Sequence, residues 1–512
     1  MQAEKVSLDT SGAQGLLLGS LSLDLGLFGG GTPTYTVGGT ITGYNGTGLV
    51  LQNNGGSNYT VPAGATNFTL PSGIADGSTF SVTVATAPGN PPQQCMVAGG
   101  TGTINAADEV GVSISCTDNT WGATTVGANM TGISGAPYLA GGIDNNGKGV
   151  IVYTSNTNQN LMWSSVSAPS TLWAAGTSIG ATGSAITMLD FDISQNGTGI
   201  GIWQRGLLTP FLSAYFNGSA WSSIQNVGTT SHNSLQINMN AAGGGLITAI
   251  ENSNSLAFKN TAAADFATNI GLTATSICSG NPYDATTSSS GRAAVGCGDA
   301  QSYLQLYERV GSSFILENAP GIQSQNIDTS INDSGNILAA YIGLYDSNLY
   351  LSHRSGGIWS GATVIENGGD VNDAATAIDS TGNMLVAWYR LSGSLCISRK
   401  LAANTSWSVA QCATVDSGVG GKVILAVNDA GYGYVGLMRA TGGSSPRRYY
   451  VDSVDTRGQI AFPATLTIRR TNFAGHSPPF VLSVNATGQG MWATTDSNNG
   501  GTSYFVFAEV LQ

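Results

Sequence analysis

The sequence predicts an all-β protein in which a small β-sandwich precedes a closed β-propeller. Three observations lead to this prediction. Glycine accounts for 72 of 512 residues, and only 9% are charged, against about 25% in an average globular chain. Residues 35–117 carry short segments of alternating polar and apolar residues between turn residues, as antiparallel strands do. From residue 118 a β-type motif recurs eight times, and such long-period repetition is typical of propeller blades.

The charge balance limits the classes of partner. The net charge is −12, from 17 basic and 29 acidic residues. A net negative charge opposes extensive contact with nucleic acid or anionic lipid, which are also negatively charged. No stretch approaches 18 consecutive apolar residues, the length that a membrane helix needs. We therefore expect no nucleic-acid partner and no membrane span.

Cysteine spacing predicts three disulfides. None of the six cysteines has the short spacing of metal ligands, and only three histidines are present to assist them. The expected pairs are Cys95 with Cys116, Cys278 with Cys297, and Cys396 with Cys412. The midpoint of the last pair falls in the turn-like segment AANTS, which places both sulfurs across a hairpin. We expect no metal, no cofactor, and an extracellular or outer-surface location, with the periplasm as the alternative.

Residues 1–34 read as an extended segment or linker. Within them SLSLDLGLF alternates apolar and polar residues, as a strand does. One interpretation is an exposed strand without a partner. The other is a strand that completes a sheet of a neighbouring copy, by strand addition between subunits.

The sandwich segment, residues 35–117, is expected to be antiparallel, with Cys95 and Cys116 joining its last strands. TVGGTITG, GTGLVLQNNGG, ADGSTFSVTV and SISCT give it a likeness to a known family. It resembles the cysteine-bearing immunoglobulin-like repeats of bacterial surface proteins. That resemblance implies a spacer or stalk in an exported bacterial protein.

The repeat consists of an apolar residue, Asp, Asn or Ser, two variable residues, glycine, and an apolar strand. We expect the polar residue to bond to the turn backbone and the glycine to adopt a positive φ. The eight glycines are Gly147, Gly197, Gly243, Gly291, Gly335, Gly382, Gly431 and Gly488.

Each repeat contains four strands, except the last. The final repeat, which ends in SYFVFAEVLQ, has only three. A fourth is available at the other end of the propeller segment, in residues 119–127. Its pairing with the last repeat would close residues 118–512 into a ring and remove both open edges. We expect eight blades, with seven as the alternative.

The propeller segment resembles the sialidase-like superfamily in blade length and in the ending NGSAW of one third turn. The Asp box of that superfamily, SxDxGxxW, is absent from every blade. No arginine precedes Arg205, so the first member of the family's arginine triad has no counterpart. DSTGNMLVAW is closer to the non-catalytic DxxGNxxxxW repeats of exported bacterial proteins. This resemblance implies a binding module rather than an enzyme.

Arginines mark the candidate ligand site. Six of the twelve lie between Arg439 and Arg470, in the seventh repeat, and guanidinium groups beside tyrosines suit a carboxylate or a sulfate. The alternative is a solvated, salt-bridged surface. Arg205, Arg390 and Arg439 each end a second strand, so we expect them to lie at one face of the propeller. Asp190, Asp284 and Asp328 are expected near the same end of their first strands. The candidate ligand-binding residues are Arg205, Arg390, Arg439, Arg447, Arg448, Tyr449 and Tyr450.

The favoured function is an exported, non-enzymatic binding or adhesion module whose propeller face binds glycan or protein. Two alternatives remain. One is a structural subunit of an extracellular assembly, joined through the N-terminal strand as a homo-assembly. The other is a glycosidase or lyase that acts on an acidic polysaccharide, although no acid pair of the required separation is evident in the sequence.

Overall fold

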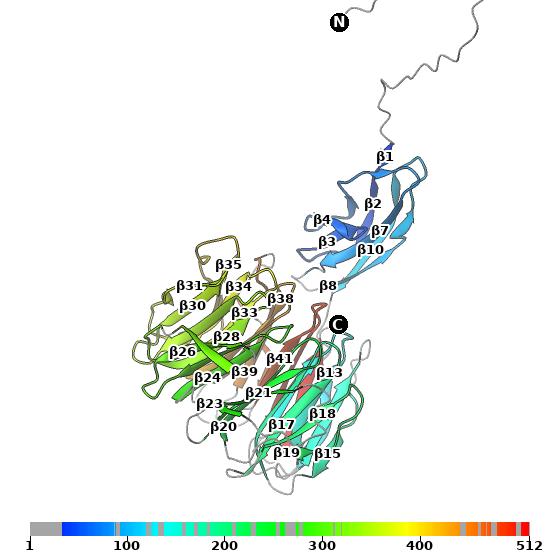
Figure 1. The fold of residues 1–512 in the computed structure, drawn as a ribbon. Helices are drawn as coiled ribbons and strands as arrows, with labels where there is room; N and C mark the ends of the chain where they lie inside the picture. Colours follow the sequence, from blue (N-terminus) through cyan, green and yellow to red (C-terminus); the bar gives the residue numbers. More distant parts are fainter. Residues whose placement is uncertain are drawn as a thin grey trace, which may run out of the picture.

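All 43 regular elements of the described chain are β-strands, as the composition predicts (Figure 1). The computed structural model describes residues 33–86, 88, 93–118, 124–131, 138–155, 160–167, 173–181, 185–206, 211–226, 232–251, 256–261, 273–275, 280–310, 313–318, 320–440, 447–458, 462–466, 468–472, 479–497 and 503–510. No helix in these ranges is long and apolar enough to cross a membrane. The predicted strand SLSLDLGLF lies outside them.

The first ten strands form a sandwich. One sheet has the order β5 (Asn67–Thr69), β2 (Val37–Thr42), β10 (Glu109–Asp118), β8 (Gln93–Ala98). The other has the order β4 (Gly56–Thr60), β3 (Val50–Asn53), β7 (Thr79–Thr86), β9 (Thr101–Thr103), and a short pair joins β1 (Thr34–Tyr35) to β6 (Ile74–Ala75). Leu49, Leu51, Phe68 and Ile114 are among the residues of one buried core, which supplies most of the stability of so small a unit.

The sandwich departs from the prediction in one respect. It is not wholly antiparallel, because β10 pairs with β2 in parallel and with β8 antiparallel. The Cys95–Cys116 disulfide joins directly opposed residues of β8 and β10, as predicted. An alternating pattern identifies a strand but carries no information about the direction of its partner.

The strands from Thr124 to Val510 form a β-propeller. Among the described residues they make eight sheets, which we number in chain order. Sheet 1 contains β12 (Leu139–Ile143), β13 (Gly149–Ser155), β14 (Asn160–Val166) and β15 (Thr177–Ala181), and sheet 2 contains β16 (Ile186–Ile193), β17 (Gly199–Arg205), β18 (Phe211–Phe216) and β19 (Gln225–Asn226). Sheet 3 contains β20 (His232–Met239), β21 (Gly245–Glu251), β22 (Leu256–Thr261) and β23 (Thr273–Thr275). Sheet 4 contains β24 (Gly280–Thr287), β25 (Ala293–Gly298), β26 (Leu304–Val310) and β27 (Ser313–Asn318).

Sheets 5 to 8 continue the same order of strands. Sheet 5 contains β28 (Ser324–Ile331), β29 (Ile337–Gly343), β30 (Leu349–Ser355) and β31 (Ile358–Trp359), and β32 (Thr363–Glu366) also pairs with β30. Sheet 6 contains β33 (Val371–Ile378), β34 (Met384–Arg390), β35 (Ser394–Lys400) and β36 (Gln411–Thr414), and sheet 7 contains β37 (Gly420–Val427), β38 (Tyr432–Ala440), β39 (Arg447–Asp455) and β40 (Ile468–Asn472). Sheet 8 contains β41 (Phe480–Val484), β42 (Gly490–Ser497), β43 (Ser503–Val510) and β11 (Thr124–Thr131). In sheet 8 the fourth strand is β11, from the start of the propeller segment, because β11 pairs with β43.

The first strand of each sheet, which we call the inner strand, contacts the inner strand of the next sheet, and β41 contacts β12. Sheets 1 and 8 share a buried core that includes Ile151, Tyr153, Met491 and Val506. The Nδ2 group of Asn485 also donates to the backbone oxygen of Asp144 at 2.9 Å, which joins the last repeat turn to the first.

The repeat turns behave as predicted. All eight repeat glycines have φ between 74° and 91°, in the left-handed region that side chains avoid. In each turn the glycine N–H donates to the carbonyl of the residue three positions earlier, as Gly382 does to Asp379 at 3.1 Å. These turns lie at one face of the propeller, the turn face. The connections from second to third strands lie at the opposite face, the loop face.

Two predicted disulfides are described. Cys396 and Cys412 are bonded across β35 and β36, where they are directly opposed in the ladder. Cys278, the predicted partner of Cys297, lies outside the described residues.

Candidate functional site

The loop face carries the arginines that the sequence singles out. Arg205 ends β17 and Arg390 ends β34, while Arg439 is the last residue but one of β38. Arg448 is the second residue of the following strand, β39, and lies directly opposite Arg439 in the ladder. The fold therefore brings side chains from sheets 2, 6 and 7 to one face, as expected from the ends of their second strands.

Asp416 is the centre of the arginine cluster. It lies in the connection between sheets 6 and 7 and accepts a hydrogen bond from the Tyr450 hydroxyl at 2.9 Å. The same carboxylate pairs with Arg448, and its Oδ2 atom lies 3.4 Å from Nη1 of Arg439. Burial raises the pKa of Tyr450, so its hydroxyl remains a donor at neutral pH. One carboxylate is thus shared by two guanidinium groups, which leaves one excess positive charge.

Arg439 is an unusual component of this cluster. It is only 5% exposed, and its Nε atom has no hydrogen-bond partner among the described residues, while its Nη1 atom forms the ion pair with Asp416. A buried donor without a partner costs free energy, and more so when it is charged. Arg448 is more accessible, with 34% of its side chain exposed. The cluster therefore contains one buried guanidinium group that lacks part of its hydrogen bonds, that of Arg439, and one that solvent reaches, that of Arg448. We call Arg439, Arg448, Asp416 and Tyr450 the arginine site.

The other predicted residues take different positions. Arg390 pairs with Glu366 of the preceding sheet, and Arg447 contacts the Met438 sulfur at 3.6 Å. Tyr449 is completely buried, with ring centroids 5.4 Å from Phe480 and 6.1 Å from Trp492.

Tyr449 therefore belongs to the core between sheets 7 and 8 and offers nothing to a ligand. Arg205 lies in sheet 2, whereas the arginine site is built from sheet 7 and the connection before it. Of the seven predicted residues, the structure brings Arg439, Arg448 and Tyr450 together.

Carboxylates on the inner strands join neighbouring sheets. Inner strands are edge strands, so part of their backbone N–H groups lack a ladder partner. Asp190 accepts from Ile237 N at 2.8 Å, and Asp192 from Met239 N at 2.7 Å. Asp328 likewise accepts from Thr376 N at 2.7 Å. These acids are cross-links between blades.

This finding corrects the expectation for Asp190, Asp284 and Asp328. They lie in the middle of their strands and not with the arginines at the loop face. Asp284 accepts from both N and Oγ1 of Thr329, at 2.7 Å each. A structural role explains all three.

A polar cavity of about 420 Å³ lies among the inner strands. Its walls include Asp192, Asp284, Asp328 and Asp429. At the turn face the Ser289 hydroxyl donates to Asp429 at 2.6 Å, a contact between sheets 4 and 7. No group of three or more metal-ligating side chains occurs in the part of the chain that the structure describes.

Burial changes the acidity of the carboxyl groups on the inner strands. It raises the pKa of Asp190 to about 6 and that of Asp192 to about 7, against the effect of their backbone hydrogen bonds. Burial, with the charge of Asp284, raises the pKa of Asp328 to about 7. The charge of Lys422, on an inner strand, opposes the pKa shift of Asp328, and its Nζ atom lies 3.6 Å from Oδ2 of Asp373.

These shifts predict a pH dependence of stability. A carboxyl group whose pKa is higher in the folded than in the unfolded state stabilises the fold below about pH 4, and this contribution is lost as pH rises through its folded pKa. The free energy of unfolding should therefore fall between about pH 4 and pH 7. Denaturant titrations at a series of pH values measure the number of protons that the chain takes up on folding. In the Asp192→Asn or Asp328→Asn variant this number should be lower than in the native chain by about one.

The control for this prediction is Asp299→Asn, on an exposed loop of sheet 4, which should keep the native pH dependence. Equal pH profiles for all three variants and the native chain would contradict the assignment.

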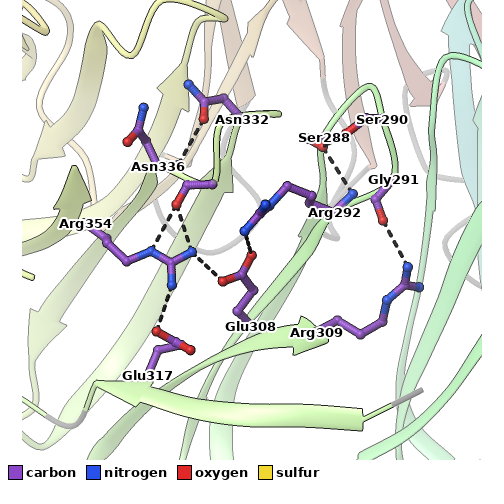
Figure 2. Close-up of polar contacts among 11 residues, drawn as sticks. Ser288, Ser290, Gly291, Arg292, Glu308, Arg309, Glu317, Asn332, Asn336 and Arg354 are labelled. Carbon is purple, nitrogen blue, oxygen red and sulfur yellow. Dashed lines mark hydrogen bonds and ion pairs between the residues drawn. The ribbon is translucent and has the colours of Figure 1, made fainter. Parts of the chain in front are cut away.

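A second set of arginines was missed by the sequence analysis. Arg309, Arg354 and Arg399 occupy equivalent third-strand positions, 45 residues apart. Arg354 donates from Nε and Nη2 to the carbonyl of the repeat glycine Gly335, at 3.0 and 2.8 Å (Figure 2). Arg309 donates to the carbonyl of Gly291 at 3.0 Å in the same way. The regular spacing was the available signal.

Arg354 also links sheets 4 and 5. It pairs with Glu308 and, at 2.7 Å, with Glu317, while Glu308 pairs with Arg292 as well (Figure 2). Glu308 and Arg354 have only 6% and 8% of their side chains exposed. Each charged side chain of this network has a partner of opposite charge within it, so it is a structural network.

The fold and the contacts described above define a β-propeller protein with a cluster of arginines at its loop face. Neither a protein-family model nor a curated protein matches this chain. Solved structures similar to it include the fucose-specific lectin from Aleuria aurantia, with 13% identity over 56% of this chain and 97% of that chain, and a TM-score of 0.35. The Dos1 propeller has 11% identity over 75% and 94% of the two chains, with a TM-score of 0.43.

A third similar structure is the PL25 polysaccharide lyase, an ulvan lyase. It has 11% identity over 75% of this chain and 96% of that chain, with a TM-score of 0.40. All these values are low, so the propeller assignment rests on the order and contacts of the sheets.

Proposed function

We propose that this protein is an exported, non-enzymatic binding module that binds an acidic glycan on the loop face of its propeller. The observation that carries the proposal is the arginine site. Its two guanidinium groups share one carboxylate, and the Nε atom of the buried Arg439 has no hydrogen-bond partner among the described residues. A carboxylate or sulfate of the ligand would satisfy both the excess charge and this donor.

The proposed role of the arginine site is binding rather than catalysis. Its acidic member, Asp416, is held by Arg448 and Tyr450, which keeps the carboxylate engaged as an acceptor. A glycosidase needs a second carboxyl group across the scissile bond. Among the described residues no second carboxylate is paired with this cluster, which supports the non-enzymatic proposal.

The architecture that we propose is a closed ring of eight blades preceded by an immunoglobulin-like spacer. The contact of β41 with β12, the shared core of sheets 1 and 8, and the pairing of β11 with β43 support the ring. Two packed sheets with a disulfide between β8 and β10 support the spacer. The disulfides also support export, because such bonds persist in oxidising compartments.

The test is a glycan-array screen of the full chain, which includes oligogalacturonate as a carboxylated glycan, chondroitin sulfate as a sulfated one and dextran as a neutral one. We expect binding to acidic glycans. Arg448→Ala should weaken this binding about tenfold or more, because a charge-assisted hydrogen bond is lost. Arg448→Lys should recover only part of it, since lysine lacks the planar fork of donors.

The matched control is Arg292→Gln on the turn face, which removes the same charge from a side chain that is 42% exposed. It should bind as the native chain does. Equal binding by the native and Arg448→Ala chains, or no binding of a folded native chain to any acidic glycan, would contradict the proposal.

A further inference from the structure

The loop face of sheets 4 and 5 presents tyrosines that the core does not use. Tyr345 is 83% exposed and Tyr303 is 39% exposed, and Leu344 beside Tyr345 is 37% exposed. Tyr303 is the last residue of the second-to-third-strand connection of sheet 4, and Tyr345 lies in that of sheet 5. Both connections end on the same face as the arginine site. Unlike the tryptophans Trp203 and Trp388, which are fully buried in repeated positions, Tyr345 has no packing role.

The loop that carries Tyr345 is held rigidly. Asp346 accepts hydrogen bonds from the Tyr350 hydroxyl at 2.6 Å and from Asn348 N and Nδ2 at 3.1 and 3.0 Å. The Tyr350 ring stacks on the buried Tyr341, with centroids 5.8 Å apart. The loop is thereby anchored to the core of sheet 5, so Tyr345 remains exposed in a fixed loop.

Left-handed serines occur in both loops. Ser302 has φ 65° and Ser347 has φ 50°, whereas the corresponding connection of sheet 6 has Gly393 with φ 104°. The left-handed conformation is unfavourable for a residue other than glycine. The connection of sheet 6 is two residues shorter, so the two serines belong to a loop that sheets 4 and 5 share and sheet 6 lacks.

One segment ties the two loops together. Tyr303 forms a β-bridge with Gln323, and Ser324 N donates to the carbonyl of Ser302 at 3.0 Å. Leu344 N donates to the carbonyl of Gln323 at 2.9 Å. The Nε2 group of Gln323 donates to the carbonyl of Gln301 at 2.7 Å. The side-chain amide of Gln323 is therefore held between the two loops that carry the tyrosines.

We propose that Tyr345 and Tyr303, with the side-chain amide of Gln323 between their loops, form a second, aromatic subsite that binds a pyranose ring. An exposed aromatic ring matches the apolar C–H face of a sugar, and amide groups beside it match the equatorial hydroxyls. This inference rests on the proposed function and extends it. The glycan would contact the aromatic subsite on sheets 4 and 5 and the arginine site on sheet 7.

The test is a glycan-array screen of the full chain with the same carboxylated, sulfated and neutral glycans, carried out on the native, Tyr345→Ala, Tyr345→Phe and Arg448→Ala chains. We expect Tyr345→Ala to weaken binding about tenfold, and Tyr345→Phe, which keeps the ring, to bind as the native chain does. Because Tyr345 is exposed and contacts no core residue cluster, its replacement should leave the melting temperature unchanged.

The outcomes separate the two proposals. Binding that is lost in Arg448→Ala but unchanged in Tyr345→Ala overturns the aromatic subsite alone. Binding that is lost in Tyr345→Ala but unchanged in Arg448→Ala overturns the arginine site and supports the subsite. Equal losses in Tyr345→Ala and Tyr345→Phe contradict a stacking role, and no binding by the folded native chain overturns both proposals.

Discussion

Removal of residues 1–131 should strongly destabilise the propeller, whereas removal of residues 1–118 should not. The difference between the two truncations is β11 and the residues just before it. β11 pairs with β43, and β43 contributes Val506 and Ala508 to the core that sheets 1 and 8 share. Without β11 this edge is open, and an open apolar edge promotes aggregation. We expect the melting temperature to fall by roughly 10 °C or more.

Thermal unfolding followed by circular dichroism, with light scattering to detect aggregation, measures this effect. The chain without residues 1–118 is the matched control, because it loses the whole sandwich but keeps β11. Equal melting temperatures and equal scattering for the two truncations would mean that β11 does not close the propeller.

Replacement of Glu308 should give the largest loss of stability expected from a single substitution. Glu308 pairs with both Arg354 and Arg292, and its side chain is 6% exposed. Glu308→Met keeps the volume but leaves the buried guanidinium of Arg354 with Glu317 and a carbonyl as its remaining partners. Breaking a buried pair in this way costs about 3 kcal/mol or more.

Two further variants separate charge from packing. Glu317→Gln removes a partner whose side chain is 24% exposed, and should cost about 1 kcal/mol or less. The double variant Glu308→Met/Arg354→Leu removes both buried charges and should recover much of the stability that Glu308→Met loses. Chemical denaturation measures all three. A double variant less stable than Glu308→Met would contradict the electrostatic explanation.

Much of the propeller was predictable because the repeat motif combines two local requirements. The turn requires a positive φ at one position, and glycine occupies it, as Gly382 does. The residue three positions earlier must accept hydrogen bonds from the turn backbone, and a polar residue such as Asp379 does so. The pairing of β11 with β43 was predictable for a different reason. A repeat with one strand too few leaves an edge that a spare strand elsewhere can cover.

Other features depend on contacts between segments that are distant in the sequence. The parallel pairing of β2 with β10 is one example, since alternation does not encode strand direction. Tyr449 and Tyr450 are another. Successive strand residues point to opposite sides of a sheet, so Tyr449 packs toward Phe480 while Tyr450 reaches Asp416. The sequence placed both tyrosines in the ligand site because it did not show which neighbour each side would meet.

The arginine site itself was only partly predictable. The cluster of arginines was evident, but Asp416 lies in a different repeat and becomes their partner only when sheets 6 and 7 pack together. The inner-strand acids show the converse. Asp190, Asp284 and Asp328 stood at a constant distance from their repeat glycines, yet that regularity reflects the backbone N–H groups of the next blade and not a ligand.

The most direct test of the proposed function is the affinity of the full chain for the acidic glycan that binds best, measured by titration calorimetry at increasing salt concentration. The account predicts that affinity falls steadily with salt, and that the salt dependence is weaker in Arg448→Ala because one fewer charge takes part. An affinity that is independent of salt, or a salt dependence identical in the native and Arg448→Ala chains, would contradict the arginine site as the place where the glycan binds.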